Sequence, residues 1–108
     1  MIISTSLRGG SNSDILANEC AKRAKEVGHD VELLSLKGKD IKYCIGCLSC
    51  QKNGRCVLKD DVADIMAKVK DAEVIVYATP IYYYEMCGQM KTLLDRLNPC
   101  LLYTSDAA

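Results

Sequence analysis

The amino-acid sequence predicts an α/β fold in which helices cover both faces of a parallel sheet. Strand-like and helix-like segments alternate in the order strand, helix, strand, helix, strand, helix, which is typical of parallel sheets with right-handed crossovers. The last strand-like segment is a continuous apolar run, as expected for a strand that is buried on both faces. The 108 residues are enough for one hydrophobic core, so we expect one domain.

The first strand and the first helix occupy the start of the chain. Residues 2–4 form a short apolar strand, and a polar loop with two glycines follows it. Ser11 or Asn12 is expected to cap the next helix, because either side chain can accept a hydrogen bond from its free N–H groups. Apolar and small side chains then recur every three or four residues up to Gly28, which is placed to end the helix.

A long irregular segment separates the second strand from the second helix. Residues 29–36 alternate between polar and apolar side chains, which predicts a strand. Residues 37–59 have neither a helical nor a strand period and hold four cysteines, so we expect a Cys-rich loop there. Asp60 or Asp61 is most simply the cap of the helix that follows, whose apolar side chains recur at helical spacing up to Val69.

The third strand and the third helix complete the recognisable pattern. Residues 72–79 predict the strand, which Pro80 ends, and an apolar stripe over residues 86–97 predicts the helix. Sheets of this doubly wound type normally have five strands, whereas residues 100–108 lack a strand pattern. We therefore expect strand order 2-1-3 in a single domain, residues 1–108, that is truncated at its C-terminus.

Charge and composition exclude several functional classes. Basic and acidic residues number 14 each, so no broad basic face is available to bind nucleic acid through its phosphates. No apolar run approaches the roughly 20 residues that cross a bilayer, and no targeting segment opens the chain, so we expect a cytoplasmic protein. Without a secretory signal, the seven cysteines favour metal or redox chemistry over structural disulfides.

The loop after the first strand has the chemistry of a phosphate site. In a doubly wound sheet, ligands bind at the C-terminal ends of the strands where the chain order reverses. The following helix directs free N–H groups and the positive end of its dipole toward a bound anion. An ordinary polar turn with a helix cap is the alternative, since neither a Rossmann fingerprint nor a P-loop is present. The candidate side chains are Ser4, Thr5, Ser6, Arg8, Ser11, Asn12 and Ser13.

The loop after the third strand faces the same crevice if the strand order is 2-1-3. It begins with Pro80 and Ile81 and continues with three tyrosines at residues 82–84. A proline-stiffened turn with aromatic rings can line a slot for a flat ring system such as a flavin. The alternative is that the tyrosines cover a sheet edge or a subunit contact.

The Cys-rich loop contains a compact cysteine motif. Cys44, Cys47, Cys50 and Cys56 follow the spacing C-x2-C-x2-C-x5-C, which can bring four thiolates to one centre. Three interpretations compete: a [4Fe–4S] cluster, a four-cysteine zinc site, and thiols that are free or form disulfides. Three cysteines at successive two-residue gaps favour the cluster over zinc, which more often uses two separated pairs.

Taken together, these motifs resemble the flavodoxin-like NADPH-dependent FMN reductases and, more closely, the iron-sulfur flavoproteins. The resemblance covers residues 1 to about 99 and rests on residues 4–13, on residues 44–56 with the Asp60-Asp61 pair, on residues 79–82, and on Lys91, Asp95 and Arg96. It implies a flavodoxin-like fold. The sequence departs from the family pattern at Thr5, where glycine is favoured, and at Leu7, where proline is favoured.

The resemblance also implies cofactors and their ligands. Ser6, Arg8, Ser11, Asn12 and Ser13 would bind the FMN phosphate, Pro80, Ile81, Tyr82 and Tyr83 would line the isoalloxazine, and Cys44, Cys47, Cys50 and Cys56 would hold a [4Fe–4S] cluster. We expect an oxidoreductase in which NAD(P)H or a ferredoxin-like donor reduces FMN and electrons pass to an acceptor, with no acid–base residue required. The expected partners are that donor, that acceptor and further copies of the chain in a homo-oligomer. The alternatives are a flavodoxin-like electron carrier without a substrate of its own, and a nonfunctional fragment.

The remaining residues with reactive side chains receive simpler interpretations. His29 is expected to be structural, and Cys20 and Cys87 are expected to be small helix residues. For Asp95 and Arg96 we expect either a solvated helix end or a contact that holds the flavin loop.

Overall fold

The computed structural model describes residues 1–99, so the expectation of no further strand at residues 100–108 lies outside it. The first half of this part of the chain contains β1 (Ile2–Ser4), α1 (Asn12–Glu26), β2 (Leu33–Ser35) and α2 (Cys50–Asn53). The second half contains α3 (Val62–Asp71), β3 (Val76–Ala78), β4 (Ile81–Tyr82), β5 (Glu85–Met86) and α4 (Gly88–Asp95).

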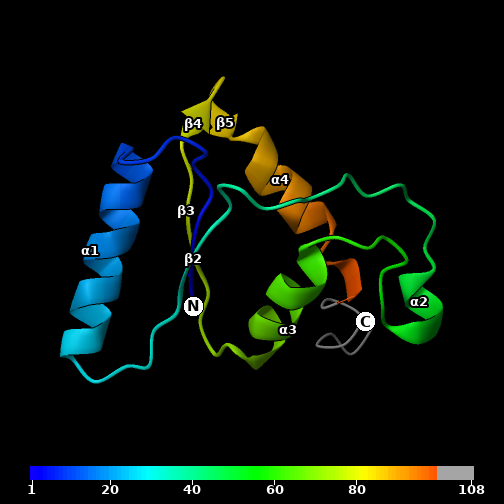
Figure 1. Cartoon of the computed structure of the whole chain (residues 1–108), viewed down its shortest axis with the longest axis horizontal. Coiled ribbons are helices and arrows are strands. Elements are labelled where there is room, and N and C mark those ends of the chain that lie inside the picture. The colour runs from blue at the N-terminus through cyan, green and yellow to red at the C-terminus, as the bar shows by residue number, and fades with distance from the viewer. Residues whose placement is uncertain (100–108) are drawn as a thin grey trace.

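The central sheet has three parallel strands in the order β2-β1-β3, which confirms the predicted topology. Ile2 of the central strand pairs with Leu33 on one side and Val76 on the other. The flanking strands are shorter than the sequence pattern predicts, because β1 offers only three residues for pairing. Figure 1 shows α1 on one face of this sheet and α3 and α4 on the other. The fold is therefore the expected doubly wound α/β class.

The two faces of the sheet bury separate apolar clusters, since successive strand residues point to opposite sides. Ile2 packs with Ala17 and Ala21 of α1, whose small side chains allow the helix to approach closely. Ile3 faces the larger cluster on the side of α3 and α4. The members of that cluster are Ile3, Leu34, Leu36, Val62, Ile65, Met66, Val69 and Leu93.

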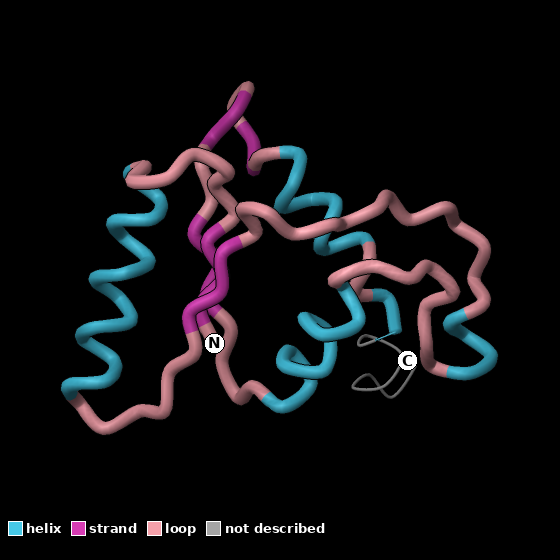
Figure 2. Tube along the Cα trace, viewed as in Figure 1, coloured by secondary structure: helices cyan, strands magenta, loops and turns pink. Residues whose placement is uncertain are grey.

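One short helix and one hairpin of two strands were not predicted from the sequence. The four-residue helix α2 interrupts the Cys-rich loop, and the rest of that segment between β2 and α3 is mostly irregular (Figure 2). The tyrosine loop folds as an antiparallel hairpin, β4 with β5, and α4 begins at Gly88 rather than at Met86. Among the described residues, no helix is long and apolar enough to cross a membrane.

Candidate cofactor site

The two predicted cofactor loops begin side by side at the C-terminal edge of the sheet. The backbone N–H of Thr5 donates to the carbonyl of Ala78 (2.9 Å), and the Thr5 hydroxyl donates to the same oxygen (3.1 Å). Thr5 is fully buried. Because Thr5 opens the loop after β1 and Ala78 ends β3, these bonds fix the bases of both loops against each other.

The first loop closes onto the N-terminus of α1, as the sequence predicts. The Ser11 hydroxyl accepts a hydrogen bond from the N–H of Asp14 (3.2 Å), so Ser11 is the N-cap. The Ser6 hydroxyl accepts from the N–H of Arg8 (3.2 Å) and holds the turn. Gly10 has a φ of 70°, a conformation that glycine adopts without strain. The loop is therefore preorganised around the free N–H groups of α1.

The predicted phosphate ligands differ in their exposure. Ser6, Ser11 and Ser13 are buried, whereas Arg8 and Asn12 are exposed. Within the described residues, the guanidinium of Arg8 forms no ion pair and is available to an anion. The structure thus places all five side chains on one loop and helix start, with the hydroxyls inside and the cation outside.

Lys37 is a second cation beside this loop, and the sequence analysis missed it. A Cβ atom added to Gly9 would lie 3.1 Å from the Lys37 Nζ, so the ammonium group lies over the loop. Lys37 follows β2, the strand that flanks β1 in the 2-1-3 order. Lys37 comes two residues after the end of β2, at the edge of the sheet where ligands are expected, and this position is the signal by which the sequence could have indicated it. A carboxylate is also close, because Asp14 accepts a hydrogen bond from the Ser4 hydroxyl at the start of α1.

A buried cluster of polar side chains joins the first loop, the end of β3 and the start of α4. The Cys87 Sγ lies 3.4 Å from the Thr5 Oγ1 and accepts a hydrogen bond from the Thr79 Oγ1 (3.2 Å). The Cys87 N–H in turn donates to the Thr79 Oγ1 (3.3 Å). Cys87 is the fully buried N-cap of α4. Cys87 is buried like a small apolar residue, as expected, but it precedes α4 as its N-cap, whereas Cys20 lies within α1.

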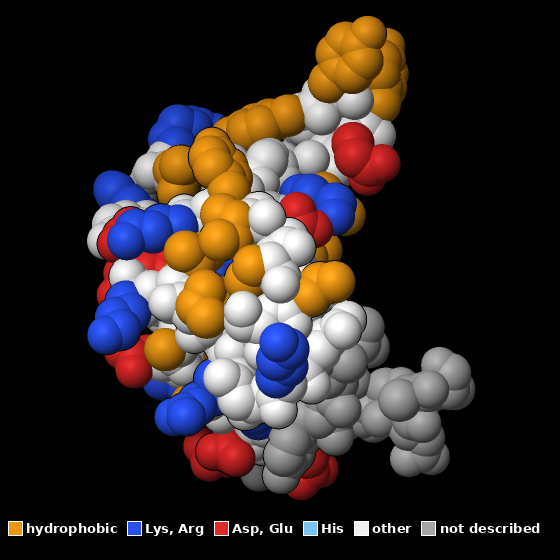
Figure 3. All heavy atoms as spheres, turned by 90° about the vertical axis from the view of Figure 1, so that its right-hand side faces the viewer, with side chains coloured by type: hydrophobic (Ala, Val, Ile, Leu, Met, Phe, Trp, Pro, Cys, Tyr) orange, Lys and Arg blue, Asp and Glu red, His pale blue; other side chains and the backbone are white. Residues whose placement is uncertain are grey.

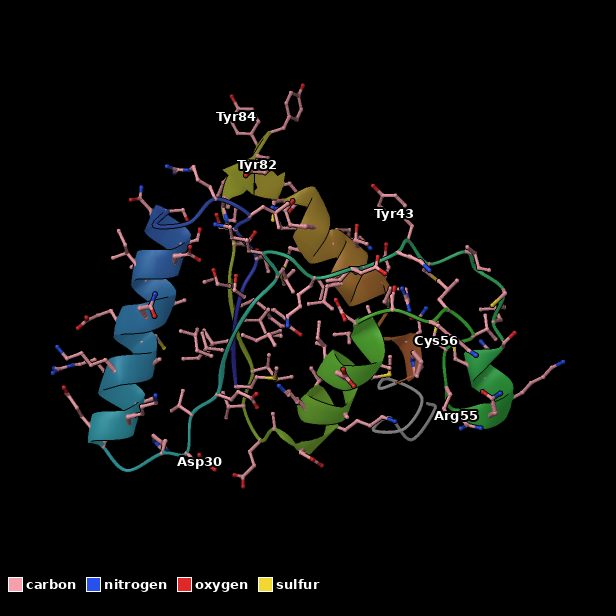
Figure 4. The ribbon with its side chains drawn as sticks, viewed as in Figure 1. Asp30, Tyr43, Arg55, Cys56, Tyr82 and Tyr84 are labelled. Atoms are coloured by element: carbon pink, nitrogen blue, oxygen red, sulfur yellow. The ribbon has the colours of Figure 1, made fainter. Side chains whose placement is uncertain are left out.

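The tyrosine hairpin projects away from the sheet (Figure 4). Tyr83 and Tyr84 form its turn with φ values of 49° and 65°, and their rings meet edge to face with centroids 5.8 Å apart. Both side chains are almost fully exposed, at 94% and 95%. Ile81 and Tyr82 are exposed and Pro80 is half-buried at the base of the hairpin. The tyrosines therefore do not cover the sheet edge.

The four cysteines of the motif line one pocket, together with Arg96 and Pro99 from the C-terminal side of α4. Much of the remaining lining is apolar and comes from Ile45, Leu48, Val57 and Leu58. Apolar side chains are also prominent on the outer face of this region in Figure 3, where Tyr43, Ile45, Leu48 and Val57 are exposed. Each of the four cysteines is a free thiol. Among residues 1–99, no three His, Cys, Asp or Glu side chains are gathered closely enough to hold a metal ion.

An ion pair closes the base of the Cys-rich loop. The Arg96 guanidinium contacts both carboxylate oxygens of Asp60, at 2.6 Å and 3.1 Å, and donates to the Lys42 carbonyl (2.8 Å). Asp60 also accepts from the N–H groups of Lys42 (2.8 Å) and Val62 (3.1 Å). Burial would raise the pKa of Asp60, but Arg96 and these N–H donors hold it below its usual value.

This ion pair corrects two expectations. Asp60 does bond the first N–H of α3, yet its main partner is Arg96, while Asp61 occupies the N-cap position and binds the Asp40 N–H (2.6 Å). Arg96 is 2% exposed, so it is neither a solvated helix end nor a contact to the flavin loop. Asp95 is the residue that stays near solvent, where it pairs with Lys91.

One thiol of the motif is electrostatically distinct. Hydrogen bonds from the side chain and the backbone of Ser49 lower the pKa of Cys47 below its usual value. Cys47 is exposed, as is Cys44, whereas Cys50 and Cys56 are half-buried. The exposed thiols are the more accessible pair, and the half-buried thiols lie closer to the protein interior.

Comparisons with known proteins agree with this arrangement. The family described as NADPH-dependent FMN reductase matches residues 1–106. An iron-sulfur flavoprotein of Methanocaldococcus jannaschii is 37% identical over 97 residues, covering 90% of this chain and 50% of that protein. An iron-sulfur flavoprotein of Archaeoglobus fulgidus is 39% identical over 85 residues, covering 79% of this chain and 42% of that protein.

A third relative has a different name. A Bacillus subtilis protein named as a possible NAD(P)H-dependent FMN-containing oxidoreductase is 29% identical over 100 residues, covering 93% of this chain and 52% of that protein. The chain spans about half the length of the curated relatives it matches. With the family match extending over nearly all residues and the parallel sheet in the order 2-1-3, the chain belongs to the NADPH-dependent FMN reductase family.

Proposed function

We propose that the chain binds FMN and an iron-sulfur cluster and serves as an oxidoreductase that passes electrons from a reduced donor to an acceptor. The observation that carries this proposal is the pair of hydrogen bonds between Thr5 and Ala78, which sets the two predicted flavin loops against each other at the ligand edge of the sheet. Family membership supports FMN as the ligand, and the names of the relatives support the cluster.

The phosphate of FMN would bind at the start of α1. A phosphate there accepts hydrogen bonds from free N–H groups and gains from the helix dipole. Arg8 and Lys37 supply the opposite charge and offset the nearby carboxylate of Asp14. The remaining ligands of this proposal are Ser6, Ser11, Asn12 and Ser13.

The isoalloxazine would lie along the start of the tyrosine hairpin. These residues, Pro80, Ile81, Tyr82 and Tyr83, follow β3 after Thr79, next to the base of the phosphate loop. Their exposure leaves apolar surface that a flat ring system can cover. Bound FMN supplies hydride and single-electron chemistry, so the residues of the chain have to bind and orient it rather than transfer protons.

The cysteine pocket fits an iron-sulfur cluster by its donors and by one orphaned polar atom. Cys44, Cys47, Cys50 and Cys56 present four soft sulfur ligands to a single apolar pocket, and thiolates are the ligands that such clusters take. Arg96 also lines this pocket, and among residues 1–99 its buried Nε has no hydrogen-bond partner, as expected near a site for a negatively charged group. Cluster binding would draw the four sulfur atoms together from their present positions.

NAD(P)H is the donor we propose, with a small molecule or a redox protein as the acceptor. The relative named for NAD(P)H and FMN supports this choice of donor. We further propose a cytoplasmic location, since free thiols need a reducing compartment, and a homo-oligomer that would cover the exposed tyrosine hairpin.

Anaerobic purification followed by absorption spectroscopy and metal analysis tests the proposal. The protein should take up about one FMN and about four irons per chain, and it should then oxidise NADH or NADPH in steady state. Failure to bind FMN would contradict the proposed flavin site. FMN binding with stoichiometric zinc, or with no metal after reconstitution, would contradict the proposed cluster. FMN and iron without NAD(P)H oxidation would favour an electron carrier.

A further inference from the structure

Arg96 has one nitrogen atom that its ion pair does not use. The guanidinium carries five N–H donors, and its Nη1 and Nη2 atoms bind Asp60 and the Lys42 carbonyl. The Nε atom is buried and, in the part of the chain that the structure describes, has no hydrogen-bond partner. Buried N–H groups without partners are rare in proteins, so this one calls for an acceptor.

The cysteine pocket is the place where such an acceptor can arise. Arg96 lines it together with all four thiols of the motif. Of these four thiols, that of Cys56 also lines a second pocket together with Arg96, beside α3. A thiol is a weak acceptor, whereas a metal-bound thiolate is negatively charged and accepts hydrogen bonds strongly.

A purely structural role accounts for only part of this arrangement. The ion pair with Asp60 and the hydrogen bond to Lys42 connect the end of α4 to the Cys-rich loop. They use only the two terminal nitrogen atoms of Arg96 and do not need Nε. A lysine in its place could supply the charge but has no second nitrogen atom to serve a second acceptor. Arg96 therefore binds Asp60 and also lines the cysteine pocket with one nitrogen atom unused.

We propose that Arg96 is a positioning residue of the cysteine centre. Its Nε–H donates to a cysteine sulfur of the bound cluster, with Cys56 as the nearest candidate, and its charge raises the reduction potential of that cluster. The inference rests on the proposed cluster and adds a residue that controls it. Cys56 is the nearest candidate because it shares two pockets with Arg96, whereas the other three cysteines share one.

The direction of the effect follows from electrostatics. Reduction adds one electron to the cluster and makes it more negative, and a fixed buried cation stabilises the more negative state. Hydrogen bonds to the sulfur atoms act in the same direction, because sulfur gains negative charge on reduction. Arg96 is 2% exposed, so solvent screens its charge only weakly.

A spectroscopic test needs no change at Arg96. Protein containing ¹⁵N-arginine is reconstituted with iron and sulfide, reduced, and examined by electron–nuclear double resonance for coupling between the cluster and nitrogen. Arg55 precedes Cys56 and is the other arginine beside the motif, so the measurement uses Arg55→Lys as the background. We expect one coupled nitrogen to remain in that background. Absence of any coupling in a protein that holds its cluster would overturn the proposal.

A redox titration tests the energetic consequence. Arg96→Lys retains a positive charge and removes the Nε–H, and we expect the reduced cluster to become about tenfold less favoured, a fall of about 59 mV for one electron. Arg55→Lys makes the same charge-conserving exchange at an exposed arginine and should leave the potential nearly unchanged. Asp60→Asn leaves the Arg96 Nε in place and removes a negative charge, so it should not lower the potential.

The outcomes separate this inference from the proposed function. If wild-type protein binds no iron, the proposed cluster fails. If it binds about four irons and Arg96→Lys has an unchanged potential, the cluster stands and the role of Arg96 is overturned. If Arg96→Lys cannot hold iron, the nitrogen coupling in the Arg55→Lys background decides the question.

Discussion

The carboxylate of Asp60 and the guanidinium of Arg96 are 36 positions apart in the chain and form a two-point ion pair. Their side chains are 0% and 1% exposed. The pair also holds Lys42 at the opposite end of the Cys-rich loop through its N–H and carbonyl groups. A loop with little regular structure thus has a rigid base, and its stability depends on one buried carboxylate.

The first prediction concerns the ion pair between Asp60 and Arg96. Asp60→Ala leaves the Arg96 charge buried without its counter-ion, and breaking such a pair costs about 3–5 kcal/mol. We expect a loss of this size in the free energy of unfolding, measured by circular dichroism in denaturant. Asp61→Ala is the matched control, since Asp61 loses a hydrogen bond to the Asp40 N–H but no buried ion pair. Equal losses in the two variants would contradict the assigned role of Arg96.

Low pH should weaken the ion pair between Asp60 and Arg96. The folded protein holds the pKa of Asp60 below its usual value, so Asp60 contributes stability above the unfolded pKa of about 3.9. That contribution is lost as the pH falls through the lower folded pKa. We therefore expect the stability of the wild type to fall more steeply than that of Asp60→Asn as the pH falls below about 4. Parallel curves for the two proteins would show that Asp60 titrates normally.

The proposed phosphate site predicts a selective loss of affinity. Arg8→Ala removes one charge from the loop, and a hydrogen bond to a charged group contributes about 1.5–3 kcal/mol, so FMN should bind about tenfold or more weakly. Riboflavin lacks the phosphate and should be affected little. Lys37→Ala should show the same selectivity, because its ammonium lies over the loop at Gly9. Fluorescence titration measures both ligands.

The control for this experiment is Arg23→Ala. Arg23 is an exposed arginine in the last turn of α1, paired with Glu26 and remote from the N-terminal loop. The Arg23→Ala substitution changes the net charge of the protein by the same amount as Arg8→Ala. If it weakened FMN binding as much as Arg8→Ala, the effect would be one of total charge rather than of the proposed site.

Local patterns in the sequence were sufficient to predict the helices α1, α3 and α4. Ser11 caps α1 as expected, because its hydroxyl and the Asp14 N–H are separated by only three residues. The apolar stripe of α3 faces the core, with Val62, Ile65 and Val69 buried. Such features depend on neighbours within one or two turns, so periodicity alone reveals them.

The features that the sequence did not predict depend on distant contacts or on unusual turns. Nothing near Arg96 in the sequence indicates burial, since its partner Asp60 is brought in only by the fold. The hairpin turn uses Tyr83 and Tyr84 with positive φ, whereas the recognisable hairpin turns carry glycine or asparagine. Lys37 is separated from Gly9 by a complete helix and strand, so its approach to the phosphate loop required the sheet order.

The last prediction concerns the four cysteines. If Cys44, Cys47, Cys50 and Cys56 hold one cluster, replacing any one with serine should lower the iron content from about four per chain, because one iron of the cluster then loses its thiolate ligand. Cys20→Ser is the matched control, because Cys20 is an exposed free thiol on α1, at the far side of the sheet from the cysteine pocket. Cys87→Ser should also retain iron, since Cys87 is buried against Thr5 and lies outside the pocket. Iron analysis after anaerobic reconstitution measures all six variants, and FMN binding in each shows that the fold survives. Equal loss of iron in the motif and control variants would mean that the metal is held by adventitious thiols rather than by one centre.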